Sequence, residues 1–482
     1  MNKFIFTILF FISFGSFAQQ RPFTDQAVAK LADNYNLGLY AQIYNQFSPD
    51  AKGILTEESI IQLYKENLLP PLGRITTWNY VDEVRTNANY IVNFERGKMR
   101  LKIAVRKDLL ITYYEWLPVK PEKEIAAPRN TALIKTSNPK QTQLQLHLDS
   151  LARAYLRDPN NSSLSIGIIE GNTVSSYFYG ETKKESNTLP DEKSLYEIGS
   201  ISKTFTAALL AHAINEKKIA LTDDIRKYLP GEYPELQFKG TPIRIVNLAN
   251  HTSGLPRLPL DLSSSPGYNA EDPYAHYSKE MIYQYLKTFK PDTIAGARSE
   301  YSNLGFAILG TILENIYHKP LEELVKNTIT GPLKMNSTYF DVPESERAMM
   351  TTGYSDESGK AVSYWQLAAF KACGGLKSNT QDMLSYLKAN MANTNPDFVL
   401  SHKETDRQAD FSRGLAWMLS PFRGTINVWH NGGTAGFRTW CGYIRDKKIG
   451  VVILSNSAED VDEIALDLLS FSLKHPAPAG TK

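Results

Sequence analysis

The segment Tyr196-Glu-Ile-Gly-Ser-Ile-Ser-Lys-Thr-Phe-Thr206 is the most informative stretch of the 482-residue chain for both fold and chemistry. A strand-like run gives way to a helix near Gly199, which places Ser200 and Lys203 one helical turn apart on the same face. Serine is a weak nucleophile at neutral pH, and a lysine whose pKa is lowered by partial burial can act as its base. The backbone N–H of Ser200, at the start of a helix, also faces the position where an oxyanion would form. The segment therefore predicts a nucleophilic serine, although a Ser-x-x-Lys spacing alone should recur about once or twice by chance in a chain of this length.

The helix that follows Lys203 is apolar nearly all round. Its apolar positions are Phe205, Ala207, Ala208, Leu209, Leu210, Ala211, Ala213 and Ile214. Such a helix lies at the centre of a domain rather than on its surface. A polar Ser–Lys pair at its buried start needs partners, and a catalytic site is one way to supply them.

Tyr301-Ser302-Asn303 is a second polar group, placed directly before an apolar stretch that is expected to be helical from Leu304 to Leu313. A tyrosine near a cation can pass a proton between a nucleophile and a leaving group, and an asparagine amide can hold a substrate carbonyl. Roughly one Tyr-x-Asn is expected by chance, because the chain has 26 tyrosines.

His430-Asn431-Gly432-Gly433 is a third group, expected at the end of a strand Asn427–His430. Glycines on a strand edge let a substrate backbone approach closely, and the Gly433 N–H is a candidate second oxyanion donor. The alternative reading is that a lone histidine beside two glycines is a turn residue.

Taken together, the three groups resemble the boxes of the penicillin-recognising serine hydrolases: class C β-lactamases, D-alanyl-D-alanine peptidases of low molecular mass, and their esterase relatives. The boxes occur in family order as Ser200-Ile-Ser-Lys203, Tyr301-Ser-Asn303 and His430-Asn-Gly432. Flanking segments also resemble the family, namely Asn250-His-Thr-Ser-Gly-Leu255 and Gly374-Gly-Leu-Lys-Ser378 with Asp382. The resemblance covers about residues 142–473 and implies an α/β two-lobed fold of the β-lactamase/transpeptidase type, in which an antiparallel sheet flanked by helices adjoins an all-helical lobe.

The resemblance also implies acyl-enzyme chemistry. Ser200 would attack a carbonyl, with Lys203 and Tyr301 sharing the role of base, and Tyr301 would protonate the leaving group. The N–H groups of Ser200 and Gly433 would form the oxyanion hole. Substrate contacts would come from Asn303, His430, Gly432 and Gly433. No cofactor and no metal ion is implied.

One departure from the family concerns the third box, which is Lys-Thr-Gly in class C β-lactamases but begins with His430 here. Histidine at this place is typical of the peptidase and esterase branches, and a neutral imidazole anchors a carboxylate less strongly than an ammonium does. Efficient β-lactam hydrolysis is therefore in doubt, and no residue selects among peptide, ester and lactam. His251 is expected to be a structural turn residue rather than a catalyst.

Composition sets the remaining limits. Lys and Arg number 53 and Asp and Glu 51, without long runs of one sign, which argues against nucleic acid or an anionic membrane as the main partner.

The apolar run after Lys3, followed by Ser16-Phe17-Ala18, predicts a signal peptide; the run is too short for the alternative, a membrane anchor. The protein is thus expected to be exported, periplasmic or secreted, without a stable membrane anchor. Its expected partner is a small acyl substrate, with cell-wall fragments as further candidates.

The sequence predicts five parts: signal peptide 1–18, a small α+β unit 19–118, a proline-punctuated linker 119–140, the hydrolase domain 141–475 and a tail 476–482. The α+β unit is expected to have helices at 23–46 and 56–68, the second with Thr56 as its N-cap. Four strands should follow, at 75–81, 89–94, 99–105 and 109–116, with a period of two in the third. It weakly resembles cone-shaped domains of the nuclear transport factor two type. In the hydrolase domain, the sequence predicts a helix at 142–157, a hairpin of 164–170 and 174–180, strands at 427–430, 437–444 and 450–455, and a helix at 460–473.

Two questions stay open from the sequence. The two cysteines, Cys373 and Cys441, could form a disulfide in an exported protein or remain buried thiols. The competing function is a non-catalytic sensor or scaffold that retains a penicillin-binding fold. The three intact polar boxes favour the hydrolase, because a site that no longer catalyses a reaction is free to lose Lys203 or Tyr301.

Overall fold

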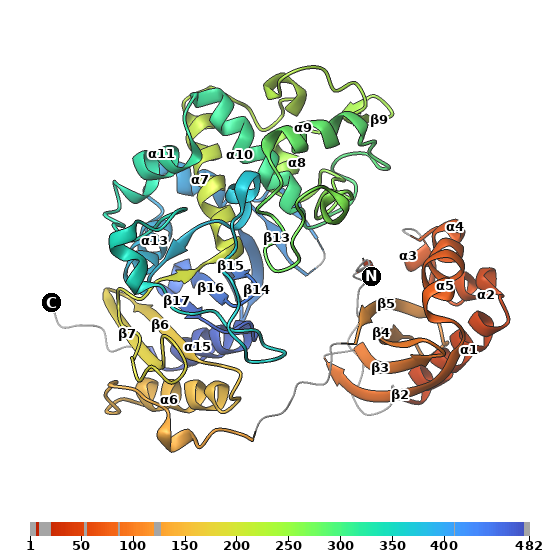
Figure 1. Cartoon of the computed structure of the whole chain (residues 1–482), viewed down its shortest axis with the longest axis horizontal. Helices are drawn as coiled ribbons and strands as arrows, with labels where there is room; N and C mark the ends of the chain where they lie inside the picture. The colour runs from red at the N-terminus through yellow and green to blue at the C-terminus, as the bar shows by residue number, and fades with distance from the viewer. Residues whose placement is uncertain are drawn as a thin grey trace. The chain divides into compact units, whose positions relative to one another are not determined.

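The computed structural model describes residues 6–8, 21–52, 55–84, 87–119, 127–408 and 410–476. The chain divides into two compact units, Met1–Glu122 and Lys123–Lys482 (Figure 1). Each unit has its own hydrophobic core. In the described part of the chain, no helix is both long enough and apolar enough to cross a bilayer.

The first unit begins with helices. They are α1 Arg21–Asn36, α2 Tyr40–Asn45, α3 Pro49–Lys52, α4 Glu57–Ile61, a π-helical segment Gln62–Leu68 and α5 Leu69–Leu72. The prediction of one continuous helix over 23–46 is wrong, because Gly38 takes a φ of 71° and interrupts the helix between α1 and α2. The expected N-cap at Thr56 is confirmed: its hydroxyl accepts from the Ser59 N–H at 3.1 Å.

A five-stranded antiparallel sheet completes this unit, in the order β1-β5-β4-β3-β2. Its strands are β1 Phe6–Ile8, β2 Ile75–Val84, β3 Asn87–Phe94, β4 Gly97–Val105 and β5 Ile111–Pro118. On β4, Leu101, Ile103 and Val105 point into the core that the helices cover, at the period of two expected from the sequence. The last strand starts two residues later than expected, because Leu109 adopts a φ of 66° in the preceding turn. Residues 1–5 and 9–20 of the chain lie outside the described residues, so the signal peptide remains a prediction.

Part of the predicted linker belongs to the second unit. Residues 120–126 lie outside the described residues, whereas Arg129 donates from its backbone N–H to the Arg157 carbonyl at 2.8 Å. The side chain of Asn138 exchanges two hydrogen bonds with the backbone of Phe178, at 3.0 and 3.1 Å.

The second unit is built on an eight-stranded antiparallel sheet in the order β12-β13-β14-β15-β16-β17-β6-β7. Its strands are β6 Ser163–Glu170, β7 Thr173–Gly180, β12 Asp406–Arg407, β13 Ser412–Arg413, β14 Met418–Phe422, β15 Thr425–Gly433, β16 Arg438–Ile444 and β17 Ile449–Ser455. The hairpin β6–β7 and the strands near 427, 437 and 450 are confirmed. The short strands β12 to β14 went unrecognised; β14 contains Pro421, which lowers the strand signal of its sequence.

Helices cover both faces of this sheet. Helices α6 Gln143–Leu156 and α15 Asp462–Lys474 cover one face, and α13 Thr380–Ala392 contacts the other. On β17, Val451 and Ile453 belong to the core beneath α6 and α15, whereas Val452 and Leu454 belong to the core on the helical side. A sheet buried on both faces explains why β17 carries four consecutive apolar residues, at 451–454.

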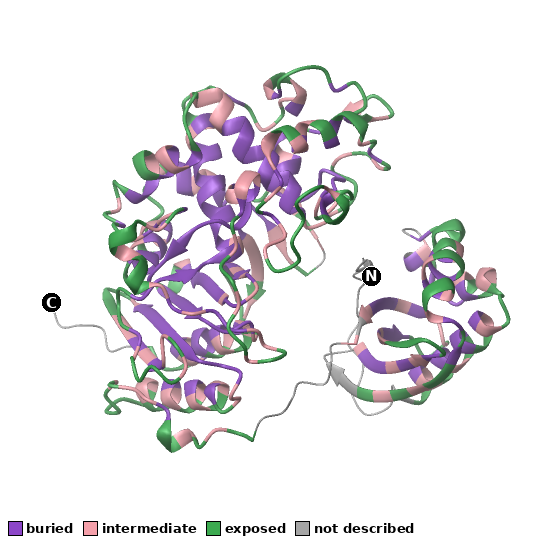
Figure 2. Cartoon of the chain, in the orientation of Figure 1, coloured by how far each residue is buried: buried purple, intermediate pink, exposed green. Residues whose placement is uncertain are grey.

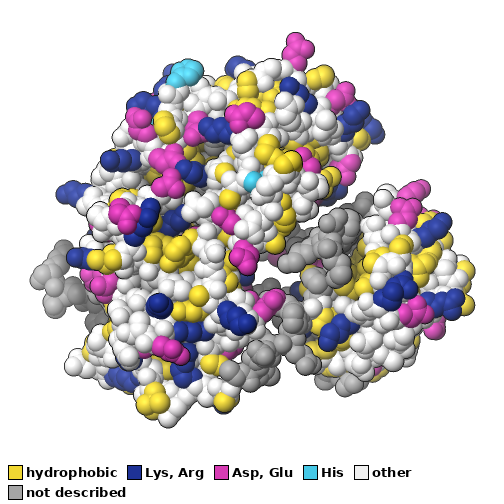
Figure 3. All heavy atoms as spheres, viewed as in Figure 1, with side chains coloured by type: hydrophobic (Ala, Val, Ile, Leu, Met, Phe, Trp, Pro, Cys, Tyr) yellow, Lys and Arg dark blue, Asp and Glu magenta, His cyan; other side chains and the backbone are white. Residues whose placement is uncertain are grey.

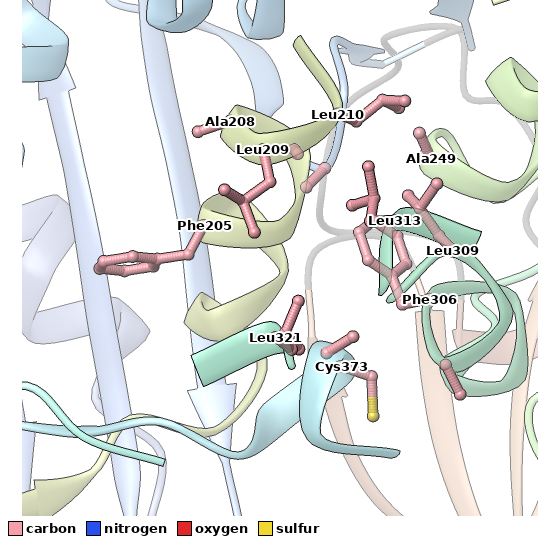
Figure 4. Close-up of a cluster of buried hydrophobic side chains, with 14 of the residues drawn as sticks. Phe205, Ala208, Leu209, Leu210, Ala249, Phe306, Leu309, Leu313, Leu321 and Cys373 are labelled. Atoms are coloured by element: carbon pink, nitrogen blue, oxygen red, sulfur yellow. The ribbon is translucent and has the colours of Figure 1, made fainter. Parts of the chain in front are cut away.

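The helical lobe surrounds two helices that are buried on nearly every side, α7 Ser202–Asn215 and α10 Asn303–Tyr317 (Figure 2). Apolar side chains of both helices belong to one core, including Leu209, Leu309 and Leu313 (Figure 4). Phe205 points away from α10 and stacks on Tyr386 of α13, with ring centroids 4.0 Å apart. The central position predicted for the helix after Lys203 is thus confirmed. The other helices here are α8 Ile245–Ala249, α9 Lys279–Thr288, α11 Leu321–Val325, α12 Lys371–Gly374 and α14 Pro396–Ser401.

Two short strand pairs complete the unit: β8 Tyr196–Glu197 with β11 Lys377–Ser378, and β9 Gln237–Phe238 with β10 Thr241–Pro242. On the face of the molecule shown in Figure 3, lysine and arginine side chains are interspersed with aspartate and glutamate.

Candidate active site

Ser200 lies on the 3₁₀ turn Gly199–Ile201 that joins β8 to α7. Gly199 takes a φ of 51°, and a Cβ added there would lie 2.5 Å from the Gly433 nitrogen. The glycine therefore lets the backbone of the Ser200 turn touch the end of β15. This contact brings the first and third sequence boxes together, with Ser200 partly exposed beside Gly433.

The Lys203 ammonium is fully buried and has three hydrogen-bond acceptors. Its Nζ donates to Ser200 Oγ at 3.0 Å, to Asn303 Oδ1 at 2.9 Å and to the Cys373 carbonyl at 2.7 Å. A neutral amine has two N–H donors and one lone pair. With Asn303 and Cys373 taking the two donors, the lone pair of a neutral Lys203 would face the Ser200 hydroxyl. The arrangement can therefore take a proton from Ser200.

Tyr301 and Asn303 lie at the N-terminus of α10. Ser302 caps this helix: its hydroxyl accepts from the Gly305 N–H at 2.9 Å and donates to the Pro256 carbonyl at 2.8 Å. The Lys203 Nζ lies 4.8 Å from the centre of the Tyr301 ring. The second box therefore faces the first, although the helix begins at Asn303, one residue earlier than expected.

His251 supports the second box from beneath. Its ring lies 4.3 Å from the Tyr301 ring, and its Nδ1 accepts from the Ser302 N–H at 3.1 Å. Burial, with the nearby charges of Arg413 and Lys203, holds the His251 pKa well below its usual range. Its backbone φ of 63° fits the turn role expected from the sequence.

The third box lies within β15 rather than after it. The predicted end of the strand at His430 is wrong, because pairing with β16 continues to Gly433, which faces Arg438. The His430 Nδ1–H donates to the Asn431 carbonyl at 2.6 Å. Burial, together with the Lys203 charge, lowers the His430 pKa to about 3, so this imidazole is neutral at physiological pH. Its ring centre lies 6.5 Å from that of Tyr301.

Gly432 is required by close packing. A Cβ at this position would collide with the Ile198 carbonyl oxygen and lie 2.5 Å from Thr439 Oγ1. That hydroxyl donates to the same carbonyl at 2.9 Å. The strand and the Ser200 turn are thus held in a fixed register.

Three contributors to the site were not identified from the sequence. Arg257 lies with its guanidinium carbon 5.0 Å from the centre of the Tyr301 ring, Cys373 supplies a backbone carbonyl, and Arg413 adds a buried charge. Arg413 lies 3.7 Å from Asp406. Only Pro256 separates Arg257 from the flanking segment at 250–255. This proximity was the feature of the sequence that could have identified Arg257 as part of the site. In the described residues, no group of three or more His, Cys, Asp or Glu side chains is placed to hold a metal ion.

Both cysteines are buried free thiols. The alternative of a disulfide between Cys373 and Cys441 is thereby removed. Burial raises the pKa of each thiol.

The site contains a serine placed to act as a nucleophile beside a buried lysine. A tyrosine and a strand edge with two glycines face this pair. Together these groups define a serine hydrolase site. The family model for β-lactamases ("Beta-lactamase") matches residues 148–472, and the chain belongs to this family. It is a hydrolase, and the family resemblance and fold predicted from the three boxes are confirmed.

Two relatives show the range of the family. The chain is 30% identical over 317 residues to the D-alanyl-D-alanine-carboxypeptidase/endopeptidase AmpH of Escherichia coli K12, covering 61% of this chain and 79% of the relative. It is 25% identical over 352 residues to a β-lactamase of Pseudomonas fluorescens, covering 65% of this chain and 94% of the relative.

Solved structures give the same fold. A β-lactamase/D-alanine carboxypeptidase from Pseudomonas syringae superposes with a TM-score of 0.60 at 23% identity, covering 70% of this chain and all of the other. The octameric penicillin-binding protein homologue from Pyrococcus abyssi superposes with a TM-score of 0.60 at 26% identity, covering 68% and 77%.

Proposed function

We propose that this hydrolase is exported and cleaves an amide or ester bond through an acyl-enzyme on Ser200, as a D-alanyl-D-alanine carboxypeptidase or an esterase-like enzyme. The observation that carries the proposal is the Lys203 Nζ held at 3.0 Å from Ser200 Oγ by two further acceptors, Asn303 and the Cys373 carbonyl. This geometry supports a base that is oriented before substrate arrives.

The proposed reaction starts when Ser200 Oγ attacks the substrate carbonyl and its proton passes to Lys203. Tyr301, next to Lys203, then delivers its proton to the leaving group and regains one from Lys203, so both groups return to their starting protonation states. The N–H groups of Ser200 and Gly433 hold the oxyanion, with Gly432 keeping the strand edge close. Water afterwards attacks the ester carbonyl, releases the acid and regenerates Ser200.

His430 and Asn303 contribute substrate contacts in this scheme. Asn303 already uses its Oδ1 to hold Lys203, so only its Nδ2, which now makes a long 3.4 Å contact to Tyr274, can donate to a substrate amide. His430 presents a neutral ring where β-lactamases of class C carry an ammonium. This difference favours peptidase or esterase activity over the alternative, a β-lactamase of the class C type.

Export and domain limits stay proposals. Residues 1–18 would be the signal peptide, and the unit at 19–118 a binding or packing module. The linker to the hydrolase domain would be shorter than the predicted 119–140, because Arg129 and Asn138 are hydrogen-bonded to the second unit. The substrate would be a small acyl compound, with cell-wall fragments as candidates.

Labelling of Ser200 tests the proposal. The full chain is incubated with a fluorescent penicillin and with a fluorophosphonate, beside Ser200→Ala and Lys203→Ala. Persistent penicillin labelling supports a peptidase, rapid turnover a β-lactamase, and labelling by fluorophosphonate alone an esterase-like enzyme; each signal should vanish in both variants. If neither probe labels the wild type, the non-catalytic sensor becomes the better explanation.

A further inference from the structure

Three cations contribute charge to this site, and they differ in how their donors are used. The charges of Lys203, Arg257 and Arg413 all act on His251. Lys203 Nζ donates its three hydrogen bonds to Ser200 Oγ, Asn303 Oδ1 and the Cys373 carbonyl. Arg413 is nearly buried, lies 3.7 Å from a carboxylate oxygen of Asp406 and donates to the Asn250 carbonyl at 3.2 Å.

Arg257 is the remaining cation. Its side chain is exposed and, within the residues that the structure describes, forms no ion pair and donates no hydrogen bond. Its guanidinium carbon lies 5.0 Å from the centre of the Tyr301 ring. The planar fork of donors that suits a carboxylate is therefore free at the edge of the reaction site.

The backbone of Arg257 is fixed, although its side chain is exposed. Its carbonyl accepts from the N–H of Asn303 at 3.0 Å and of Leu304 at 3.2 Å, and the preceding Pro256 carbonyl accepts from Ser302. The residue is thus tied to the first turn of α10, the same turn that follows Tyr301. The fixed backbone keeps the base of the Arg257 side chain next to Tyr301, and the guanidinium itself is placed by its contact with the Tyr301 ring.

The position relative to Tyr301 identifies the part of the substrate that Arg257 can reach. In the proposed reaction, Tyr301 gives its proton to the leaving group, so the leaving group must reach this ring, and the Arg257 guanidinium carbon lies 5.0 Å from the ring centre. His430, the third-box residue, is buried and uncharged, and cannot supply the positive charge that a carboxylate requires. An anionic leaving group would find its counter-charge on Arg257.

We infer that Arg257 is a specificity-determining residue that binds the carboxylate of the leaving group, and that the preferred substrates carry this carboxylate on the released fragment. The inference deepens, and rests on, the proposed acyl-enzyme function. A peptide that releases a C-terminal amino acid has such a carboxylate, whereas a simple alkyl ester has none. The arginine therefore favours C-terminal peptide bonds over neutral esters.

Two esters of similar size test this inference in the full chain: 3-carboxyphenyl phenylacetate and 3-carbamoylphenyl phenylacetate. Their difference in intrinsic reactivity cancels when the same ratio is compared between variants. The measured quantity is the ratio of kcat/KM for the acid over the amide. Arg257→Gln should lower this ratio about five- to thirtyfold, because one charge-assisted bidentate contact at an exposed site is lost. Arg257→Lys should give an intermediate ratio, since the charge remains and the fork is lost.

Arg298→Gln is the matched control. It removes the same charge three residues before Tyr301, from a side chain that is already paired with Asp292 and Glu300. Its ratio should equal that of the wild type. An Arg257→Gln ratio within twofold of the wild type, or an equal fall in Arg298→Gln, overturns the inference.

Binding to Ser200→Ala separates this inference from the proposed function. Calorimetry compares N-acetyl-D-alanyl-D-alanine with its C-terminal amide, before and after adding Arg257→Gln to the Ser200→Ala chain. If the Ser200→Ala chain binds the acid more tightly than the amide and this preference disappears with Arg257→Gln, the inference about Arg257 is supported. This holds even if the wild type hydrolyses neither ester, because that result would overturn only the catalytic proposal. Equal binding of acid and amide overturns the inference even if Ser200 is labelled normally.

Discussion

Replacing Asn303 with aspartate changes one atom type in the contact that orients the proposed base. The Asn303 oxygen lies 2.9 Å from Lys203 Nζ, and both side chains are buried. At an effective dielectric constant of about 20, a full negative charge at this distance stabilises the ammonium by about 6 kcal/mol before desolvation of the carboxylate is subtracted. Even a third of that, about 2 kcal/mol, changes the equilibrium constant between the ammonium and the neutral amine roughly thirtyfold in favour of the ammonium.

Asn303→Asp should therefore slow acylation of Ser200 at least about thirtyfold at pH 7. Because a negative neighbour favours the charged amine, the neutral amine is regained only at higher pH, and half-maximal acylation should move upward by at least about one pH unit. The assay is the pH dependence of labelling by the fluorophosphonate, followed by stopped flow. A merely structural role for Asn303 would lower the rate at every pH without moving the profile.

The control is Asn315→Asp, the same substitution on the same helix. The Asn315 side chain donates to the Tyr228 carbonyl at 3.1 Å, away from the three sequence boxes. This variant should keep the wild-type profile. A wild-type rate and profile in Asn303→Asp would refute the role of Lys203 as the base.

Further predictions concern stability and accessibility. Gly199→Ala should lower the free energy of unfolding by about 2 kcal/mol or more and abolish labelling, because a side chain there combines a positive φ with a collision against β15. In the control Gly171→Ala, φ is 63° and nothing lies within 4 Å of the added Cβ, so only about 1 kcal/mol should be lost. Equal losses of the two variants in urea denaturation would contradict the packing argument. Burial lowers the pKa of His402 to about 3, so the unfolded chain takes up this proton first as pH falls below about 6.5. His402 alone should account for a loss of about 2 kcal/mol in the free energy of unfolding by pH 5, and His402→Gln should remove that share from the stability profile. Cys373 and Cys441 should both resist a thiol reagent in the folded protein and react in guanidinium, and rapid reaction of either in the native state would show that its burial is wrong.

Several elements followed from short-range patterns. The alternation in Met99–Val105 placed β4, and the capping residue Thr56 placed the start of α4. The spacing of Ser200 and Lys203 put both on one face, because a helical turn brings positions three apart together. Such features depend on neighbours within a few residues, which the sequence displays directly.

Other elements depended on weak or distant information. The helix break at Gly38 and the extension of β15 through Gly433 were both missed, because a glycine has no single structural meaning in a sequence. Gly38 interrupts a helix, whereas the glycines at the end of β15 remain paired within the strand. The strand β14 was missed because its pairing with β15, rather than its own alternation, makes it a strand.

By itself, the sequence determined the chemical groups of this hydrolase and the family to which they belong: a serine and a lysine one turn apart, a tyrosine before a buried helix, and two glycines at a strand edge. Only the tertiary structure decided what surrounds them. The acceptors that orient Lys203 come from residues 100 and 170 positions away, and Arg257 reaches Tyr301 through the contact of a loop with the first turn of α10. Hydrogen bonds and charges between segments so far apart exist only after the core has packed, because burial of α7 and α10 brings those segments together.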